Sequence, residues 1–376
     1  MKKVDIAIVG AGIIGLAHAF HAAQAGMSVA VFERSAEAKG ASVRNFGMLA
    51  LNAQAPGEQL ISAQKTLTWW QEIAPQAGIE LRQSGCMFVA RAAEEMALLN
   101  EFSHSPAMEK QSAIMVERED LSRYSPSLRS ENIIGAMWSS ETWKIDQRQA
   151  CRKLAVWLKQ KYGVEFYFLT DVQNISPPYL ITSAGQFNAT HTIICSGNDF
   201  AALFPDDFQK TGIKNCQLQM MRTYPQPMDW QLGPFIMGGL SMTHYKAFSN
   251  CSSLQDLVTM QKERFRSYIK HGIHVIVGQE PDGRVTIGDS HAYGTDLNLP
   301  RSEEVDNLIL HELSEMMSLP VPRIEERWLG QYAYLPEGYY LKLSPRDGVT
   351  AVTQTSGQGM THGLSISKDV ILEITG

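Results

Sequence analysis

The sequence has no long apolar run, no excess of positive charge and few cysteines, and each absence excludes a class of protein. No apolar run reaches the ~20 residues that a membrane span needs, so we expect no transmembrane segment. The net charge of −6 argues against nucleic acid or an anionic membrane surface as a partner. The five cysteines are scattered, odd in number and without metal-site spacing, so we expect no metal site, and reduced thiols in a cytoplasmic protein.

What the chain does contain is enough apolar residues for a sizeable core. Its 376 residues suffice for two closely joined domains, and its composition of 44% hydrophobic and 19% charged residues is typical of a globular protein. No repeat, low-complexity tract or linker divides it. The apolar N-terminal segment is interrupted by Asp5 and continues into a glycine motif, so we interpret it as a first strand and not as a signal peptide.

Residues 4–34 have the pattern of a strand, a glycine turn, a helix and a second strand. The apolar run Ile6–Val9 is typical of a strand that is buried on both faces of a parallel sheet. Apolar residues then recur at helical spacing, whereas His18 and His21 fall on another face of that helix, where we expect them to be solvated. A second β-branched run leads to Glu33.

The glycines of this stretch predict a dinucleotide site. Gly10 allows a tight turn, Gly12 lets the backbone approach a pyrophosphate, and Gly15 lets the helix pack against the strand. The helix N-terminus offers N–H groups and a positive dipole end to phosphates. Glu33 ends the second strand, where a carboxylate can accept hydrogen bonds from a ribose diol. All four parts are in register, which favours this interpretation over the alternative, a glycine turn in an ordinary βαβ unit.

The rest of the chain alternates helical and strand patterns and then becomes antiparallel. Helices are expected over 58–76, 93–102, 119–124, 146–162, 254–270, 303–317 and in a closing segment that ends at 372. Strands are expected over 81–90, 164–169, from 172 onward and over 188–196, with an edge strand at 135–138. Residues 212–250 and 272–289 are expected to be antiparallel, with hairpins over 273–288 and 341–355.

Four motifs that follow one another along the chain carry a resemblance to a known family. They are Gly10–Gly15, Phe32–Arg34, the loop Gly40–Met48 and Ser356–Gly359. Together they resemble the FAD-dependent amine and amino-acid oxidases of the D-amino-acid oxidase, glycine oxidase and sarcosine oxidase superfamily. Segments 40–47, 218–222, 288–291 and 360–363 look like the subgroup linked to breakdown of aminoethylphosphonates.

The resemblance implies an α/β fold similar to that of glycine oxidase. A Rossmann-type FAD-binding domain would comprise residues 1–80, 145–210 and 325–376. It would interleave with an α+β substrate domain, built on an antiparallel sheet, that comprises residues 81–144 and 211–324. Some relatives attach FAD through a cysteine in the C-terminal third. No cysteine follows Cys251, so we expect FAD to be bound without a covalent link.

The resemblance also implies which residues hold FAD in an extended pose. The pyrophosphate would meet Gly10, Gly12, Ile14 and Gly15, and the adenosine would meet Glu33, Arg34 and the backbone of Val172. Ala41, Ser42, Gly47 and Met48 would line the pyrophosphate and the flavin, and Ser196 and Gly197 would close over the cofactor. Gly357, Gly359, Met360 and Thr361 would hold the pyrimidine end of the flavin, where backbone donors can stabilise charge on the reduced ring.

Two departures from the family pattern concern the substrate carboxylate. Amino-acid oxidases commonly place an arginine shortly after a Trp-x-Gly turn, where this chain has Tyr332. Sarcosine oxidases place a lysine in the C-terminal glycine motif, where this chain has Thr361. An anionic substrate therefore needs another cation. Arg44 is our candidate, since a guanidinium suits a phosphonate or a carboxylate through paired hydrogen bonds.

Five further residues are candidates for the substrate pocket, each with a structural alternative. Arg222 follows two methionines on an expected strand above the flavin; the alternative is a surface cation. His244 and Tyr245 lie in a polar loop, and either could line the pocket. His291 follows a strand end and His362 lies in the cofactor motif, where a histidine could set local charge or bind an anion; hydrogen-bonded structural roles are their alternatives.

These residues together predict an FAD-dependent oxidoreductase that acts on CH–NH or CH–NH2 donors. The expected substrate is a small anionic amine, by resemblance an aminophosphonate, with molecular oxygen as acceptor and hydrogen peroxide as product. Alternatives are a glycine, sarcosine or D-amino-acid oxidase, a NAD-binding dehydrogenase, or a flavin-binding protein without activity. The NAD alternative leaves the second glycine motif at Gly357 without a purpose. A homo-oligomer is left open.

Overall fold

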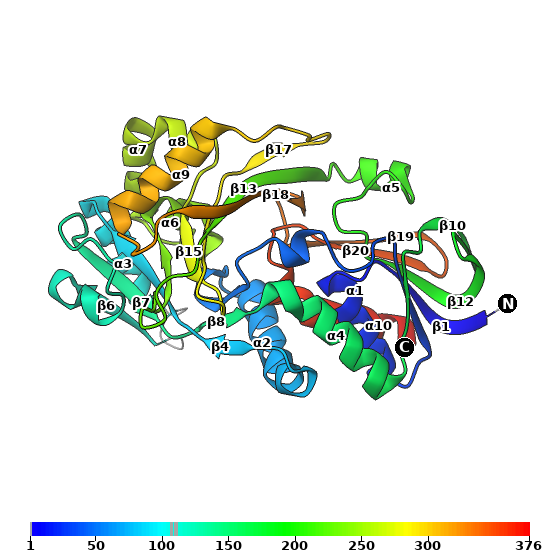
Figure 1. Cartoon of the computed structure of the whole chain (residues 1–376). Coiled ribbons are helices and arrows are strands. Elements are labelled where there is room, and N and C mark those ends of the chain that lie inside the picture. Colours follow the sequence, from blue (N-terminus) through cyan, green and yellow to red (C-terminus); the bar gives the residue numbers. More distant parts are fainter. Residues whose placement is uncertain (1, 106–107, 109–111) are drawn as a thin grey trace.

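The computed structural model describes residues 2–105, 108 and 112–376, and these residues form three sheets (Figure 1). The first sheet has eight strands and a parallel centre. Its parallel strands, in spatial order, are β20 (Val349–Gln354), β12 (Gly185–Ile194), β1 (Lys2–Val9), β2 (Val29–Glu33) and β9 (Glu165–Phe168). Antiparallel strands extend it on the β12 side: β10 (Val172–Ser176), β11 (Tyr179–Thr182) and β19 (Tyr340–Arg346).

Four helices pack together in one core with side chains of β1 and β2. They are α1 (Ile13–Gln24), α2 (Glu58–Ala77), α4 (Gln147–Tyr162) and α10 (Gly359–Thr375), and Figure 1 shows α1, α4 and α10 side by side. The side chain of Asp146 caps α4 by accepting from the amide of Arg148, and Gly163 ends the helix with φ of 71°. The fully buried indole of Trp70 donates to the carbonyl of Met360 (2.9 Å), which fastens α2 to the start of α10.

The second sheet has nine strands and is mostly antiparallel. Its order is β17 (Ala292–Gly294), β13 (Lys214–Thr223), β16 (Val285–Gly288), β15 (Ile276–Gln279), β14 (Phe235–Met237), β5 (Cys86–Ala90), β7 (Gly135–Ser139) and β6 (Ala113–Glu117). The ninth strand, β18 (Ile324–Tyr334), pairs with β13 along its length. A small third sheet joins β3 (Met48–Ala50), β8 (Thr142–Ile145) and β4 (Leu81–Gln83).

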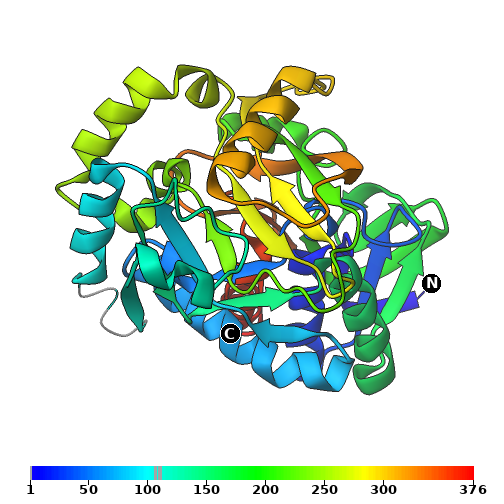
Figure 2. The same ribbon diagram turned by 60° about the vertical axis from the view of Figure 1, so that its left-hand side comes forward.

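The helices of the second sheet lie on both of its faces. They are α3 (Ala93–Ser103), α6 (Gly239–His244), α7 (Leu254–Arg264), α8 (Arg266–Lys270) and α9 (Glu303–Met316). Figure 2 shows α3, α7 and α8 on the side of the molecule far from the N-terminus. The remaining short elements are α5 (Pro205–Lys210), η1 (Ala41–Val43), η2 (Leu51–Ala53), η3 (Arg118–Arg123) and η4 (Lys246–Phe248). Within the described ranges, every helix is too short or too polar to cross a bilayer.

Three of the expected elements differ from the structure. The segment 135–138 is not an edge strand, because β7 pairs with β5 on one side and with β6 on the other. Residues 239–248, expected within an antiparallel segment, form α6 and η4. Residues 325–334, expected in the FAD-binding domain, belong to β18 of the nine-stranded sheet, and the Trp-x-Gly segment before Tyr332, Trp328–Gly330, is part of that strand and not a turn. Strand pairing decides these points, and it depends on residues far apart in the sequence.

His18 and His21, expected to be solvated, are both fully buried in α1. Nδ1 of His18 lies 2.7 Å from the carbonyl of Ile14, and Nε2 of His21 lies 2.9 Å from the carbonyl of Leu364 in α10. The expectation was wrong because α10, whose Leu364 lies 343 residues after His21, packs against α1. Burial lowers the pKa of each imidazole to about 4, so both are neutral.

Candidate active site

A cavity of about 490 Å3, the first cavity, lies where the carboxyl ends of β1 and β2 meet the N-terminus of α1. Gly10, which follows β1, has φ of +100°, and a Cβ there would lie 2.5 Å from the carbonyl oxygen of Cys195. Because Cys195 follows β12, the turn after β1 presses against the end of the neighbouring strand. Only glycine permits this approach, so the backbone can lie directly beside a ligand in the cavity.

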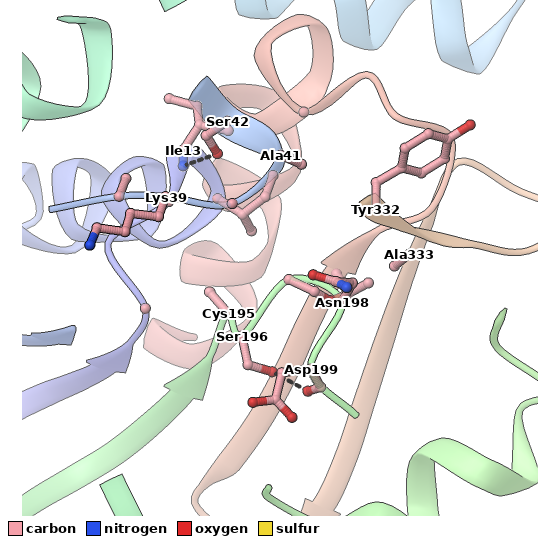
Figure 3. Close-up of a pocket in the computed structure, with 18 of the residues that line it drawn as sticks. Ile13, Lys39, Ala41, Ser42, Cys195, Ser196, Asn198, Asp199, Tyr332 and Ala333 are labelled. Atoms are coloured by element: carbon pink, nitrogen blue, oxygen red, sulfur yellow. Dashed lines mark hydrogen bonds between the residues drawn. The ribbon is translucent and has the colours of Figure 1, made fainter. Parts of the chain in front are cut away.

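Loops that follow three of the parallel strands close around the first cavity (Figure 3). Ser42, after β2, accepts a hydrogen bond from the amide of Ile13 at the start of α1 (3.0 Å). Ser196, after β12, donates to the carbonyl of Asp199 (2.8 Å). The Asp199 carboxylate pairs with Arg34 (2.6 Å), which joins the loops after β2 and β12.

The polar groups of this cavity suit a dinucleotide. The Glu33 carboxylate accepts from the amides of Ala11 (2.9 Å) and Ser35 (2.9 Å). A carboxylate has about four lone-pair sites, so Glu33 keeps capacity for the hydroxyls of a ribose. The first turn of α1 presents N–H groups and a positive dipole end to a pyrophosphate. The residues present therefore fit the adenosine diphosphate half of FAD.

Most of the predicted cofactor residues lie on this wall. Those that line the first cavity are Gly10, Gly12, Ile14, Glu33, Arg34, Ala41, Ser42, Val172, Ser196, Gly197, Gly357, Gly359 and Met360. Met48 and Thr361 line a second cavity instead. Gly15 and Gly47 line neither: a Cβ on Gly15 would lie 2.0 Å from the carbonyl oxygen of Gly10, and one on Gly47 would lie 2.1 Å from that of Ile145. Both glycines allow close backbone packing beside the site.

The second cavity, of about 110 Å3, adjoins the first at the N-terminus of α10. Both cavities are lined by Ala41, Arg44, Asn45, Gln331, Tyr332, Gly357 and Met360. The rest of its wall comes mainly from the nine-stranded sheet, including Leu218 and Met220 of β13 and Ile276 of β15. A flavin placed at this junction would meet the start of α10 on one side and, on the other, a small chamber with both apolar and polar walls.

Five of the predicted substrate residues line the second cavity: Arg44, His244, Tyr245, His291 and Tyr332. Arg44 donates from Nη1 to the carbonyl of Leu329 (2.9 Å), which leaves other N–H groups of its fork free for an anion. Burial raises the pKa of Tyr332 well above its ordinary value, so its phenol stays protonated.

Two predicted substrate residues lie elsewhere. Arg222 is buried, its Nη2 pairs with Glu326 (2.8 Å), and it lines neither cavity. His362 is fully buried behind the start of α10, between Ser62 (3.2 Å) and Gln54 (3.0 Å). The structure thus gives Arg222 an ion pair and His362 a hydrogen-bonded packing position, which were their alternatives.

His274 and Asp289 also line the second cavity, and sequence reasoning missed both. His274 sits in an apolar run that was interpreted only as a strand; a polar residue within such a run was the available signal. Asp289 follows β16, and its Oδ1 lies 3.5 Å from Nε2 of His274 and 3.9 Å from Nδ1 of His291. Burial raises the pKa of Asp289 to about 6, which His291 partly opposes.

Comparison with known proteins agrees with this architecture. Over 215 residues the chain is 26% identical to glycine oxidase from Bacillus licheniformis; the match covers 54% of this chain and 56% of that protein, so it spans just over half the length of this relative. L-proline dehydrogenase from P. horikoshii superimposes with a TM-score of 0.77 at 18% identity, covering 100% of this chain and 94% of that one. Glycine oxidase from Geobacillus kaustophilus superimposes with a TM-score of 0.75 at 18% identity, covering 99% and 94%.

These structural likenesses confirm the predicted fold, which is that of glycine oxidase: a Rossmann-type sheet joined to a second, mostly antiparallel sheet. A third similar structure, L-α-glycerophosphate oxidase from Mycoplasma pneumoniae, has FAD bound; it superimposes with a TM-score of 0.73 at 16% identity, covering 99% of this chain and 95% of that one. Residues 5–371 match the family described as FAD-dependent oxidoreductase. The chain therefore belongs to this family, and FAD is its cofactor.

Proposed function

We propose that the protein oxidises a small amine that carries an anionic group, and that this group is a phosphonate. The proposed substrates are 2-aminoethylphosphonate and its N-methyl and hydroxylated relatives. When bound, FAD supplies the oxidant that takes a hydride from the carbon next to the amine nitrogen, leaving an imine that water hydrolyses. The protein's own contribution is to bind the amine in one orientation and to exclude water.

The observation that carries this proposal is the lining of the second cavity. Its volume of about 110 Å3 suits a substrate of a few heavy atoms. Among the described residues that line it, Arg44 is the only arginine or lysine, and the position that often holds a carboxylate-binding arginine in the resembling oxidases is Tyr332. An anionic substrate would therefore be held differently from an ordinary α-amino acid.

The proposed roles follow from position. Arg44 would hold the anion through its free N–H groups, in paired hydrogen bonds. The protonated Tyr332 hydroxyl would donate a hydrogen bond to the substrate. Its ring would lie where the substrate cavity meets the flavin. Leu218, Met220 and Ile276 would keep the reacting carbon away from water.

The direct test is turnover by the purified flavoprotein. We expect 2-aminoethylphosphonate or its N-methyl form to bleach the flavin without oxygen, and to yield hydrogen peroxide when oxygen is admitted. Glycine, sarcosine and D-alanine should bleach it far more slowly. If only the carboxylates react, the phosphonate proposal is wrong. Bleaching without peroxide on admission of air would point to another electron acceptor.

Arg44→Met tests the proposed anion contact. A hydrogen bond to a charged group contributes about 1.5–3 kcal/mol, so kcat/KM for the phosphonate should fall by roughly 10- to 150-fold, mainly through KM. The matched control is Arg148→Met, because Arg148 lines neither cavity and pairs with Glu326 at the surface (3.1 Å). Equal effects of the two substitutions would contradict the role of Arg44.

Oxidation of glycine, sarcosine or a D-amino acid is the second candidate, favoured by the similarity to glycine oxidase. In that case Arg44 would hold a carboxylate, and the same variant would raise KM for glycine or sarcosine. A protein that keeps its flavin oxidised with every amine, in the absence of oxygen, would instead be a flavin-binding protein without this activity.

A further inference from the structure

Three histidines from separate elements meet at the wall of the second cavity. His244 ends α6, His274 precedes β15, and His291 follows β16. Their ring centroids are 3.8 Å apart for His244 and His274, 4.7 Å for His244 and His291, and 5.0 Å for His274 and His291. One nitrogen of each ring lies within 4.8 Å of the nitrogens of the other two.

We propose that His244, His274 and His291 bind a divalent transition-metal ion at the edge of the second cavity, with Asp289 beside it. Zn2+ is the metal that we expect. Three imidazoles with one position left open are a ligand set of catalytic zinc sites. Imidazole nitrogens with a neighbouring carboxylate also suit Fe2+ and Co2+, whereas Mg2+ and Ca2+ prefer sites built from oxygen. Spacing along the sequence predicted no metal site because 30 and 17 residues separate the three ligands.

The hydrogen bonds around the cluster use Nδ1 of His291 and of His274, and they leave Nε2 of both rings for a metal. Nδ1 of His291 lies 3.0 Å from the carbonyl of Gly272, so it carries the proton and Nε2 keeps its lone pair. Nδ1 of His274 lies 3.2 Å from the Ser241 hydroxyl. Histidines that bind metals are held through the other ring nitrogen in this way, because a carbonyl or hydroxyl partner fixes the ring orientation.

Two buried atoms of the cluster, Nε2 of His274 and Oδ1 of Asp289, lie 3.5 Å from each other and have no hydrogen-bond partner among the described residues. The two residues are only 3% and 6% exposed. An unpaired buried donor or acceptor normally costs about 1–3 kcal/mol, and a bound cation would remove that cost.

The position of His244 determines where the open coordination position of the ion would lie. His244 is exposed and lines the second cavity. His274 and His291 are buried behind it. Zinc holds nitrogen at about 2.0–2.1 Å, which places two tetrahedral ligands roughly 3.4 Å apart. The ligand nitrogens, now within 4.8 Å, would therefore close by up to about 1.4 Å. The rings would also turn out of their stacked arrangement, in which the plane of His274 makes angles of 27° with His244 and 15° with His291. The open position would then point into the cavity.

Such an ion would bring two positive charges to the second cavity, whereas Arg44 brings one. If the proposed function holds, the open position would bind a phosphonate oxygen of the substrate, in the same cavity that Arg44 lines. This second step rests on the proposed function. Metal binding itself does not, because the ligands, their hydrogen bonds and the unpaired atoms are present without any substrate.

The test is metal binding by the purified, FAD-loaded, full-length protein without substrate. After treatment with a chelator, Zn2+ is titrated calorimetrically and the bound metal is measured by mass spectrometry. We expect one ion per chain. His274→Ala should weaken binding by at least about 100-fold and Ser241→Ala, which removes only the orienting hydroxyl, by about 10-fold. The control is His311→Ala, because this exposed histidine of α9 bonds to Tyr268 (3.0 Å) and lies outside the cluster.

Each outcome decides one of the two claims. Wild-type protein that takes up no stoichiometric Zn2+, Fe2+ or Co2+, or His274→Ala that binds Zn2+ as the wild type does, overturns the metal site. Unchanged flavin absorbance and melting temperature in the variants would show that a loss of binding is not a loss of folding. Stoichiometric Zn2+ that leaves phosphonate KM unchanged would keep the site and reject its substrate role. Inorganic phosphate that binds to the cluster without metal would favour an anion site instead, against the proposal.

Discussion

The buried ion pair between Lys144 and Glu280 gives the sharpest prediction, because its loss should have a characteristic pH dependence. The two side chains are each only 3% exposed and lie 2.8 Å apart. Lys144 also donates to the carbonyl of Phe46 (2.6 Å), which lines the second cavity. Glu280→Gln would keep the shape and an acceptor for Thr286 and leave the Lys144 ammonium buried without its counter-charge.

The magnitude follows from the cost of neutralising that ammonium. Burial already lowers the pKa of Lys144 below its ordinary value of 10.5, and Glu280 opposes this effect. Without Glu280 the ammonium can lose its proton, and at about pH 8 this costs about 3 kcal/mol, since each pH unit below 10.5 costs about 1.4 kcal/mol. This is the ceiling of the destabilisation, at the lower end of the 3–5 kcal/mol typical of a broken buried pair.

The assay is urea unfolding, followed by tryptophan fluorescence, at about pH 7, 8 and 9. The folded pKa of Lys144 is depressed in the variant, so its stability relative to wild type should recover by up to about 1.4 kcal/mol per pH unit as the pH rises. Asp207→Asn, which breaks an exposed pair with Lys210, should cost less than about 1 kcal/mol at every pH. A Glu280→Gln cost that is small, or that does not shrink with rising pH, would refute the reasoning.

Other substitutions test the cofactor site and the buried polar residues. Gly10→Ala places a Cβ 2.5 Å from a carbonyl oxygen, so it should release FAD on gel filtration, whereas the wild type keeps it. His18 and His21, with pKa values of about 4, should each lower the free energy of unfolding by roughly 2 kcal/mol between pH 7 and pH 5; a flat urea midpoint over that range contradicts this. Arg222→Met should lower the melting temperature and leave KM unchanged, because Arg222 pairs with Glu326 and lines neither cavity. Because FAD is expected to be bound without a covalent link, precipitating the protein with acid should leave all of the FAD in the supernatant.

The parts that could be predicted from the sequence are those whose causes lie close together in the chain. The βαβ unit is one example, because the turn at Gly10, the helix after it and Glu33 all fall within one stretch of the chain. Strand order was not accessible in this way. Residues 325–334 were assigned to the FAD-binding domain by their position in the chain, but their backbone groups pair with β13 over its full length.

The histidine cluster shows why the substrate-binding part of the site was harder to predict from the sequence than the cofactor-binding part. Side chains alternate along a strand, so His274 and Ile276 face one side while Ile273, Val275 and Val277 face the core on the other. The sequence alone shows this alternation but not that the His274 face meets a cavity, since the cavity exists only where β13 and α6 come to lie against it. A buried histidine with a free nitrogen is costly unless something pairs with it, and here two other imidazoles and a carboxylate converge on it from different segments. The proposal of a bound cation rests on this convergence of groups and not on any single residue.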